Sequence, residues 1–363
     1  MRTLAFHLPQ FHPTSRNDEW WGKGFTEWTN VARARPVVPG HYQPHLPADL
    51  GFYDLRLPEA RAAQAALAKN YGINGFCYYH YWFSGERILE RPVNDIVASG
   101  EPNFPFCLCW ANENWTRTWD GLNSQVLLSQ KYSDKDDQRH IEALLPYFAD
   151  ARYIRLAGRP LFLVYRSELL PNPQRTAEIW RTAAQRAGLG DLFLARVESF
   201  TQNVEPGDIG FDAAVEFAPD WMNTGQLHYT KLQHILSYIG LFPQGYFKHR
   251  FIDYCEMVSR MLAKSDTAYT RYRCVTPGFD NSARRKKDAT ILLNASPEKY
   301  QEWLTTIARG ELINSRPTDE KIVFINAWNE WGEGNHLEPD QNWGHSYLEA
   351  TRNALLAAGV SIN

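Results

Sequence analysis

Short apolar runs alternate with helix-forming stretches along the chain, and this alternation constrains the fold more than any other feature. The apolar runs predict eight buried strands at Thr3–His7, Ile73–Tyr79, Phe104–Cys109, Pro160–Tyr165, Leu192–Val197, Ala213–Phe217, Arg273–Pro277 and Lys321–Ile325. Helices are predicted at Pro58–Asn70, Ile88–Ala98, Asp137–Phe148, Thr176–Ala187, Pro243–Lys264, Pro297–Ile307 and Ser346–Ala358. Eight such repeats predict an α/β fold: a single (β/α)8 TIM barrel over residues 1–363, with long strand-to-helix loops.

An open, doubly wound sheet is the alternative fold for this alternation. No Gly-rich dinucleotide-binding motif follows the first predicted strand, which favours the barrel. A long segment after that strand, containing Trp20–Trp28 and His41–His45, is predicted to be irregular. Irregular segments of this length are usually functional.

Polar and aromatic residues follow the predicted strand ends rather than the strand starts. In a (β/α)8 barrel the carboxyl ends of the strands share one face, where active sites lie. The side chains expected to converge there and to bind substrate are His7, His80, Trp110, Asn112, Glu113, Trp115, Arg117, Glu216, Asp280, Asn329, Trp331 and His336. For each residue alone, the ordinary alternative is a hydrogen-bonded side chain at a strand end.

The last predicted strand ends in two carboxylates, Glu330 and Glu333, beside Trp328 and Trp331. Carboxylates are costly to bury unless they are paired or used. Glycosyl cleavage needs one group to protonate the leaving oxygen and a second to attack or to activate the attacker. We therefore predict that Glu330 and Glu333 are the catalytic pair. The alternative is a polar loop with one satisfied and one solvated carboxylate.

Composition favours a carbohydrate site and argues against nucleic acid as a partner and against a membrane-spanning segment. The chain has 13 Trp, 18 Tyr and 19 Phe, several of them in polar, Gly-rich surroundings. Indole faces suit the faces of sugar rings. The formal charge of −3 argues against nucleic acid as a partner, and no apolar run approaches the ~20 residues that span a bilayer. The expected partner is a polysaccharide or oligosaccharide substrate.

The remaining sequence signals predict no cofactor and no metal. His41 and His45 have no third ligand nearby in the sequence. The five cysteines, Cys77, Cys107, Cys109, Cys255 and Cys274, lack the spacing of a disulfide framework, so free thiols are expected. The first residues carry no apolar segment of the secretory type, so a cytoplasmic location is expected.

Four long motifs resemble the WbsX-like family, which is related to glycoside hydrolase family 99, the endo-acting α-mannosidases and mannanases. The motifs are Phe6–Pro13, Trp20–Val31, Cys109–Arg117 and Asn329–Gly334, and the likeness to the WbsX-like family covers essentially the whole chain. This resemblance implies a (β/α)8 barrel with both catalytic carboxylates after the eighth strand. In family 99, the first glutamate deprotonates the substrate's own 2-hydroxyl, which attacks C1, and the second acts as general acid and then base. Carried over by position, Glu330 is that base and Glu333 the acid/base.

The predicted function is therefore a retaining glycoside hydrolase that works without metal, and two alternatives stay open. A glycosyltransferase of O-antigen or surface-polysaccharide assembly often holds a metal with Asp-x-Asp, a pattern that Asp134-Lys135-Asp136 fits; at a helix start, however, these residues favour capping. A non-catalytic glycan-binding protein on the same fold is the other alternative. The basic run Arg284–Lys287 is either a solvated loop or a site for uronate, phosphate or sulfate on the glycan.

Overall fold

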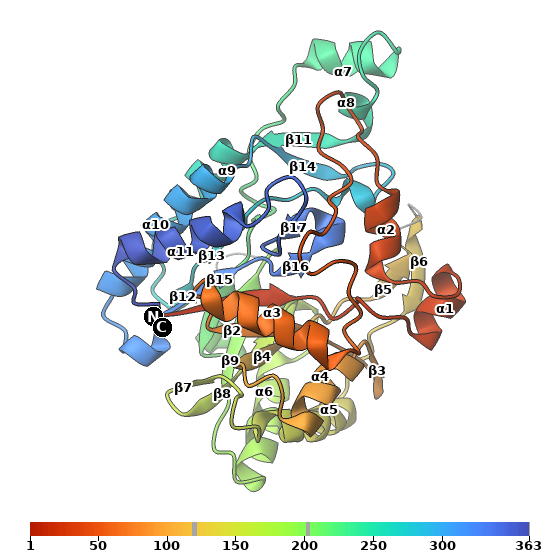
Figure 1. The fold of residues 1–363 in the computed structure, drawn as a ribbon. Helices are drawn as coiled ribbons and strands as arrows, with labels where there is room; N and C mark the ends of the chain where they lie inside the picture. Colours follow the sequence, from red (N-terminus) through yellow and green to blue (C-terminus); the bar gives the residue numbers. More distant parts are fainter. Residues whose placement is uncertain (118–121, 201–203, 363) are drawn as a thin grey trace.

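A closed ring of parallel strands forms the centre of the molecule in the computed structural model, which describes residues 1–117, 122–200 and 204–362 (Figure 1). Its strands are β1 (Arg2–His7), β2 (Gly75–Phe83), β4 (Phe106–Trp110), β8 (Arg159–Val164), β9 (Phe193–Glu198), β10 (Ala213–Glu216), β12 (Arg271–Tyr272), β13 (Cys274–Val275) and β15 (Ile322–Ile325). Apart from β12 and β13, each pairs in parallel with the next, and β15 pairs with β1 to close the ring. The seventh strand is split at Arg273: β12 pairs with β10, and β13 pairs with β15.

The strands are buried on both faces, which explains why they read as continuous apolar runs. Every residue of β2, β4, β9, β10 and β15 is buried. Phe6 packs against Tyr79, Phe217 and Phe324, with ring centroids 5.6 to 6.0 Å apart. Aromatic side chains from strands far apart in sequence therefore fill the interior of the ring.

Helices cover the ring in the order that a (β/α)8 barrel requires. They are α3 (Pro58–Asn70), α4 (Arg91–Ser99), α5 (Asp134–Phe148), α6 (Pro173–Arg186), α9 (Tyr254–Leu262), α10 (Pro297–Ile313) and α11 (Ser346–Ala358). Several begin as their sequences predict: Ser296 caps α10 by accepting from the Lys299 amide, and Pro297 follows it. A short 3-10 turn (Pro206–Ile209) stands in place of an α-helix between β9 and β10. The predicted (β/α)8 barrel is confirmed.

Two predicted segments differ from the structure. The segment after β1 is not wholly irregular, because it contains α1 (Ser15–Trp21) and α2 (Glu27–Arg33). The helix predicted over Pro243–Lys264 is instead α8 (Gly245–Lys248), β11 (Arg250–Asp253) and α9. The apolar residues of β11 pair in parallel with β14 (Thr290–Leu293), and Asp253 ends the strand by capping α9.

Smaller elements decorate the barrel. They are β3 (Glu86–Ile88), β5 (Trp115–Arg117), β6 (Leu122–Leu128), β7 (Arg155–Leu156), β16 (Asn329–Glu330), β17 (Asn335–His336) and α7 (Lys231–Tyr238). The two chain ends lie side by side at the left of the molecule, while α7 and α8 project from its top (Figure 1).

Candidate active site

A cavity of about 630 Å³ opens at the carboxyl ends of the strands. Its walls come from loops after most of the barrel strands and from the small sheet of β11 and β14. The aromatic residues that line the cavity are Tyr79, Tyr81, Trp115, Tyr165, Phe200, Phe217, Trp221 and Phe279. The charged residues that line it are Glu113, Arg250, Arg284, Arg285, Asp288, Glu330 and Glu333. Apolar ring faces beside a few charged groups are typical of pockets that bind polar ligands with flat apolar faces.

Arg284 holds three carboxylates at the cavity wall. Its Nη2 donates to Glu330 Oε2 and its Nη1 donates to Glu333 Oε1, both at 2.8 Å, and its Nε donates to Glu27 Oε1 at 2.7 Å. The three acids come from β16, the turn after it and the start of α2, so one guanidinium joins segments far apart in the chain. A guanidinium presents donors in a fixed planar fork, which sets the relative positions of the carboxylates.

Burial makes Glu330 an unusual carboxyl group. It raises the pKa of Glu330 to about 8; Glu333 and Glu27 add to the rise, and Arg284 opposes it. The neighbouring charges also hold the pKa of Arg284 well above its ordinary value, against the effect of burial. Glu333 is more open, with 26% of its side chain exposed. The pair therefore combines a buried carboxyl that titrates near neutral pH with a partner that solvent can reach.

Glycine at position 332 allows the carboxylates to meet the arginine. A β-carbon there would lie 1.8 Å from Glu27 Oε1 and 2.7 Å from Arg284 Nε, so any side chain would displace the cluster. The short turn Trp331–Glu333 ends at Gly334, whose φ of 54° suits glycine. Its last carbonyl, that of Glu333, accepts from the Asp280 amide at 2.6 Å.

Another buried carboxylate, Glu338, holds the turn in place through a hydrogen bond from Trp331. Trp331 Nε1 donates to its Oε2 at 2.6 Å, the Tyr53 hydroxyl donates to the same atom at 2.8 Å, and Gln64 Nε2 donates to Oε1 at 2.6 Å. Burial raises the pKa of Glu338 to about 7, and the three donors oppose the rise. Trp331 also stacks on His336, with ring centroids 3.7 Å apart.

Of the side chains predicted to bind substrate, two line the cavity together with the predicted pair: Glu113 and Trp115. Glu113 pairs with Arg166, and burial raises its pKa. Trp115 packs edge-on against Tyr81, with centroids 5.2 Å apart. Arg117 ends β5, and its side chain lies outside the described residues.

Trp110 and His80 belong to the core rather than to the cavity wall, which corrects their predicted contact with substrate. Trp110 is 1% exposed and packs edge-on against Trp180, 5.8 Å away. His80 stacks on His140, and their Nε2 atoms are 2.9 Å apart. Aromatic side chains at a strand end fill the space under the loops as readily as they face a ligand, and the sequence does not distinguish these positions.

The other predicted contacts lie behind the wall and hold its segments in place. Asn329 accepts from the Leu8 amide at 2.7 Å and donates to the Leu8 carbonyl at 3.0 Å, which ties β16 to the end of β1. Asn112 binds the backbone of Arg166 in the same way. Both amides therefore position cavity loops instead of facing the cavity.

The predicted acids Glu216 and Asp280 are also occupied within the protein. Glu216 is fully buried and pairs with Arg273 at 2.8 Å and Lys264 at 2.9 Å. Asp280 accepts from Gln43 at 2.6 Å and lies 2.6 Å from His41 Nε2. Burial acts to raise its pKa, but His41 and Ser282 together hold the pKa below the ordinary value. Asp280 thus fastens the segment around His41 to the loop that carries Arg284.

The remaining two predicted residues are buried histidines. His7 Nε2 lies 3.3 Å from Gln64 Oε1, and burial lowers the His7 pKa to about 3. His336 Nε2 lies 2.9 Å from His45 Nδ1, and its Nδ1 donates to the Glu338 carbonyl at 2.9 Å.

His45, His336 and Asp340 are the group of described residues that can offer three ligand atoms to a metal, within 4.8 Å of one another. The sequence suggested no third ligand for His45, because its partners lie almost 300 residues away. A hydrogen bond between the two imidazoles accounts for their contact without an ion.

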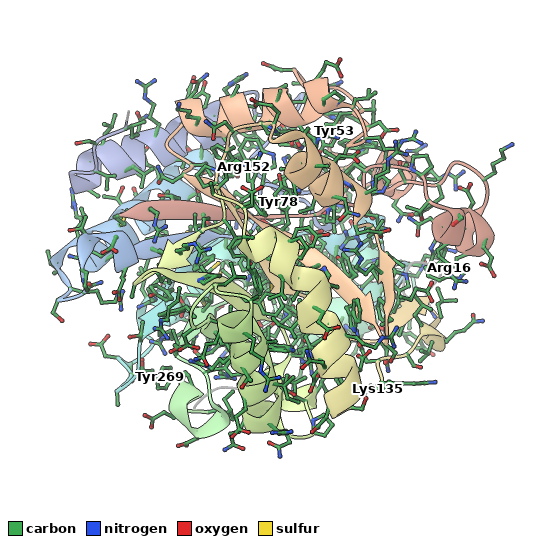
Figure 2. All side chains as sticks on the ribbon, turned by 90° about the horizontal axis from the view of Figure 1, so that it is seen from below. Arg16, Tyr53, Tyr78, Lys135, Arg152 and Tyr269 are labelled. Atoms are coloured by element: carbon green, nitrogen blue, oxygen red, sulfur yellow. The ribbon has the colours of Figure 1, made fainter. Side chains whose placement is uncertain are left out.

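The Asp-x-Asp pattern lies away from the cavity. Ser133 caps α5, Asp134 pairs with Arg175 at 2.9 Å, and Asp136 accepts from Trp82 Nε1 at 3.0 Å. Lys135, between the two aspartates, lies at the periphery of the molecule (Figure 2). In the basic run, Arg284 and Arg285 line the cavity.

The residues missed by the sequence analysis are those that organise the carboxylates: Glu27, Glu338 and the clamping role of Arg284. Glu27 and Arg284 are 257 positions apart. One signal was available for Glu27, which is an acid inside an aromatic, Gly-rich motif.

A (β/α)8 barrel with a carboxylate pair after its last strand and an aromatic cavity at the strand ends is an architecture of carbohydrate-active enzymes. The chain belongs to the family described as Glycosyltransferase WbsX, whose profile matches residues 3–351. The predicted likeness to this family is confirmed.

Two curated relatives resemble almost the whole of this chain. The chain is 46% identical over 355 residues to the uncharacterized protein WxcX from two strains of Xanthomonas campestris pv. campestris. The match covers 98% of this chain and 50% of WxcX, so the chain spans about half the length of those relatives.

Two solved structures share the fold. One is a glycoside hydrolase-like protein, with a TM-score of 0.60, 14% identity, and coverage of 97% of this chain and 93% of the other. The second is the GH99 endo-alpha-mannosidase from Bacteroides thetaiotaomicron, with a TM-score of 0.57, 13% identity, and coverage of 99% and 97%.

Proposed function

We propose that this protein is a retaining glycoside hydrolase that cleaves a polysaccharide or oligosaccharide with Glu330 and Glu333. The observation that carries the proposal is the pair itself: two carboxylates on the wall of a 630 Å³ cavity, held by one arginine. A structural ion pair needs one carboxylate for each cation, whereas here three acids share Arg284. Burial and the charges of its two neighbours raise the pKa of one of these acids, Glu330, and carboxyl groups with such raised pKa values are often functional.

The two carboxylates differ in ways that suit different roles. Glu330, with a pKa near 8, is a stronger base when ionised than an ordinary glutamate, which suits removal of a proton from a substrate hydroxyl. Glu333 is the more open of the two, which suits exchange of a proton first with the leaving oxygen and then with water. By likeness to family 99, Glu330 takes the proton of the 2-hydroxyl while that oxygen bonds to C1. Glu333 protonates the departing oxygen and becomes a carboxylate. It then takes a proton from water, whose oxygen bonds to C1 on the face that the leaving group occupied, while the C1–O2 bond breaks and Glu330 returns its proton to O2.

The experiment that tests this proposal is a screen of the purified protein against bacterial and plant polysaccharides, with detection of new reducing ends. Proton NMR of the first product anomer then tests retention. We expect release from at least one glycan, with the anomeric configuration kept. Release with inversion of the anomeric configuration would support hydrolysis but contradict the proposed retaining mechanism.

A glycosyltransferase is the second candidate, favoured by the description of the family. Calorimetric titration with common nucleotide sugars, with Mg²⁺ or Mn²⁺, separates the two functions. We expect no specific binding, because Asp134 and Asp136 are engaged on the outside of the barrel. Micromolar binding of a nucleotide sugar that is lost on mutation of cavity residues would make transfer the better account.

Trp115 gives a prediction for substrate binding. Trp115→Ala should weaken glycan affinity by about one order of magnitude, because an aromatic face at the cavity wall is lost. Trp343→Ala is the matched control, because Trp343 packs against Tyr347 outside the cavity lining. Affinity and melting temperature are measured for both variants. A large fall in the melting temperature of Trp115→Ala with unchanged affinity would assign Trp115 to the core.

The raised pKa of Glu330 gives a prediction for pH dependence. A base must be ionised to act, so kcat/KM should increase as pH rises through about 8. Because Glu330 and Glu333 interact, the apparent value belongs to the pair. The pH profile of kcat/KM checks this expectation. An acidic limb near the ordinary glutamate value of 4.5 would show that Glu330 is not the group that must lose a proton.

A further inference from the structure

Residues 222–250 form an arm that stands apart from the barrel. The arm contains α7 and α8 and ends at the first residue of β11, and it projects from the top of the molecule in Figure 1. Its helix α7 has one buried residue, Ser237. The arm therefore contributes little to the core of the barrel.

The arm exposes large apolar side chains. Half of those exposed in the described part of the chain lie between residues 222 and 247. Leu232 and Ile235 of α7 and Ile239, the residue after it, follow the spacing of one helix face. Leu241, beyond the helix, is 74% exposed, and Tyr238 and Phe247 are also exposed. A concentration of apolar surface on one projection is typical of a docking site.

The charge of the arm is entirely basic. Between Asp220 and Asp253 the sequence contains no Asp or Glu, but it contains Lys231, Lys248 and Arg250. The chain as a whole has a formal charge of −3, so this segment differs in sign from the rest of the protein. Lys231 and Lys248 are exposed beside the apolar side chains.

We propose that the arm docks on the surface of an anionic lipid membrane. The apolar residues of α7 and Leu241 would enter the boundary between headgroups and acyl chains, while Lys231 and Lys248 would contact lipid phosphates. Basic side chains beside an aliphatic and aromatic face are the pattern of segments that lie in the membrane interface. The arm cannot cross the bilayer, because the eight residues of α7 extend about 12 Å against a hydrocarbon core of about 30 Å. In the part of the chain that the structure describes, we find no helix that could span a membrane.

The basic charge favours a membrane over a second copy of the chain. A two-fold symmetric contact through the arm would bring the lysines of both copies into one interface, and the arm offers no carboxylate to neutralise them. Anionic headgroups supply that neutralisation. Trp221 precedes the arm and Arg250 ends it, and both line the cavity. Docking would therefore bring the cavity next to the lipid surface, whatever reaction occurs there.

Flotation of the full chain with vesicles tests the proposal. Vesicles of phosphatidylcholine with phosphatidylglycerol are compared with vesicles of phosphatidylcholine alone. We expect binding to the anionic vesicles and much weaker binding to the neutral ones. Lys231→Gln should reduce the affinity about fivefold, as should Lys248→Gln. The double variant Ile235→Ser and Leu241→Ser should abolish binding without changing the melting temperature, because both side chains are exposed.

Ile313→Ser is the matched control, because Ile313 is 87% exposed but lies outside the arm. It should bind anionic vesicles like the unmodified chain. Equal binding to both kinds of vesicle, or no binding to either, would overturn the proposal. A dimer seen by light scattering, absent in the double variant and unaffected by vesicles, would assign the arm to self-association instead.

Discussion

Glu330→Gln and Glu333→Gln should each lower turnover by roughly two to four orders of magnitude, the usual scale of lost acid–base catalysis. The fold should be nearly unchanged, because the amide oxygen of glutamine can still accept from Arg284. Steady-state kinetics on the glycan found in the screen, with thermal melting of each variant, checks this result. Glu302→Gln, an exposed glutamate on α10, is the control and should keep full activity.

The two variants should differ from each other on an activated substrate. An aryl glycoside has a leaving group that departs without protonation, so Glu333→Gln should recover most of its first-step rate. Glu330→Gln should not recover, because its base is still absent. Recovery of both variants, or full activity of either on the natural glycan, would contradict the roles assigned here.

Arg284→Met should have the second large effect, on stability and on the pH profile. It leaves three carboxylates without their shared cation, and losing one partner of a buried ion pair typically costs about 3–5 kcal/mol. The pKa of Glu330 should rise further, because Arg284 is the group that lowers it. The free energy of unfolding in urea and the pH dependence of kcat/KM are the two measurements.

Glu27→Gln in the Arg284→Met background sharpens this test. Removing one of the three orphaned carboxylates should restore part of the stability, whereas the same change in the unmodified protein should destabilise it. A double-mutant cycle measures this coupling. Arg309→Met, which alters an arginine bound to the Ala357 carbonyl, is the control and should change little. Additive effects of Glu27→Gln and Arg284→Met on the free energy of unfolding would show that Glu27 and Arg284 do not stabilise each other.

The barrel could be predicted from the sequence because its strands are buried on both faces. Continuous apolar runs such as Ile322–Ile325 carry that information locally. The strand β11 was missed because it has four residues between two helical segments, too few to show the alternation of apolar and polar residues that marks a strand. Its structure depends on pairing with β14, about 40 residues later in the chain.

The candidate site could be predicted only where reactive side chains come directly after a strand in the sequence. Glu330 and Glu333 stand immediately after the last strand, and a barrel brings that position to the active face. Trp110 and His80 have the same sequence signal but turn into the core. The contacts of Arg284 with Glu27, and of Glu338 with Tyr53, join segments more than 250 residues apart. No local pattern encodes such contacts, so the organisation of the carboxylates emerged from the structure alone.

The measurement that tests the central claim most directly is a crystal structure of the Glu333→Gln variant with its glycan bound. We expect the sugar in the 630 Å³ cavity, with one glycosidic oxygen within hydrogen-bond distance of residue 333 and a hydroxyl of the same sugar within hydrogen-bond distance of Glu330. A glycan bound elsewhere, with neither residue in contact with it, would contradict the assignment of Glu330 and Glu333 as the catalytic pair.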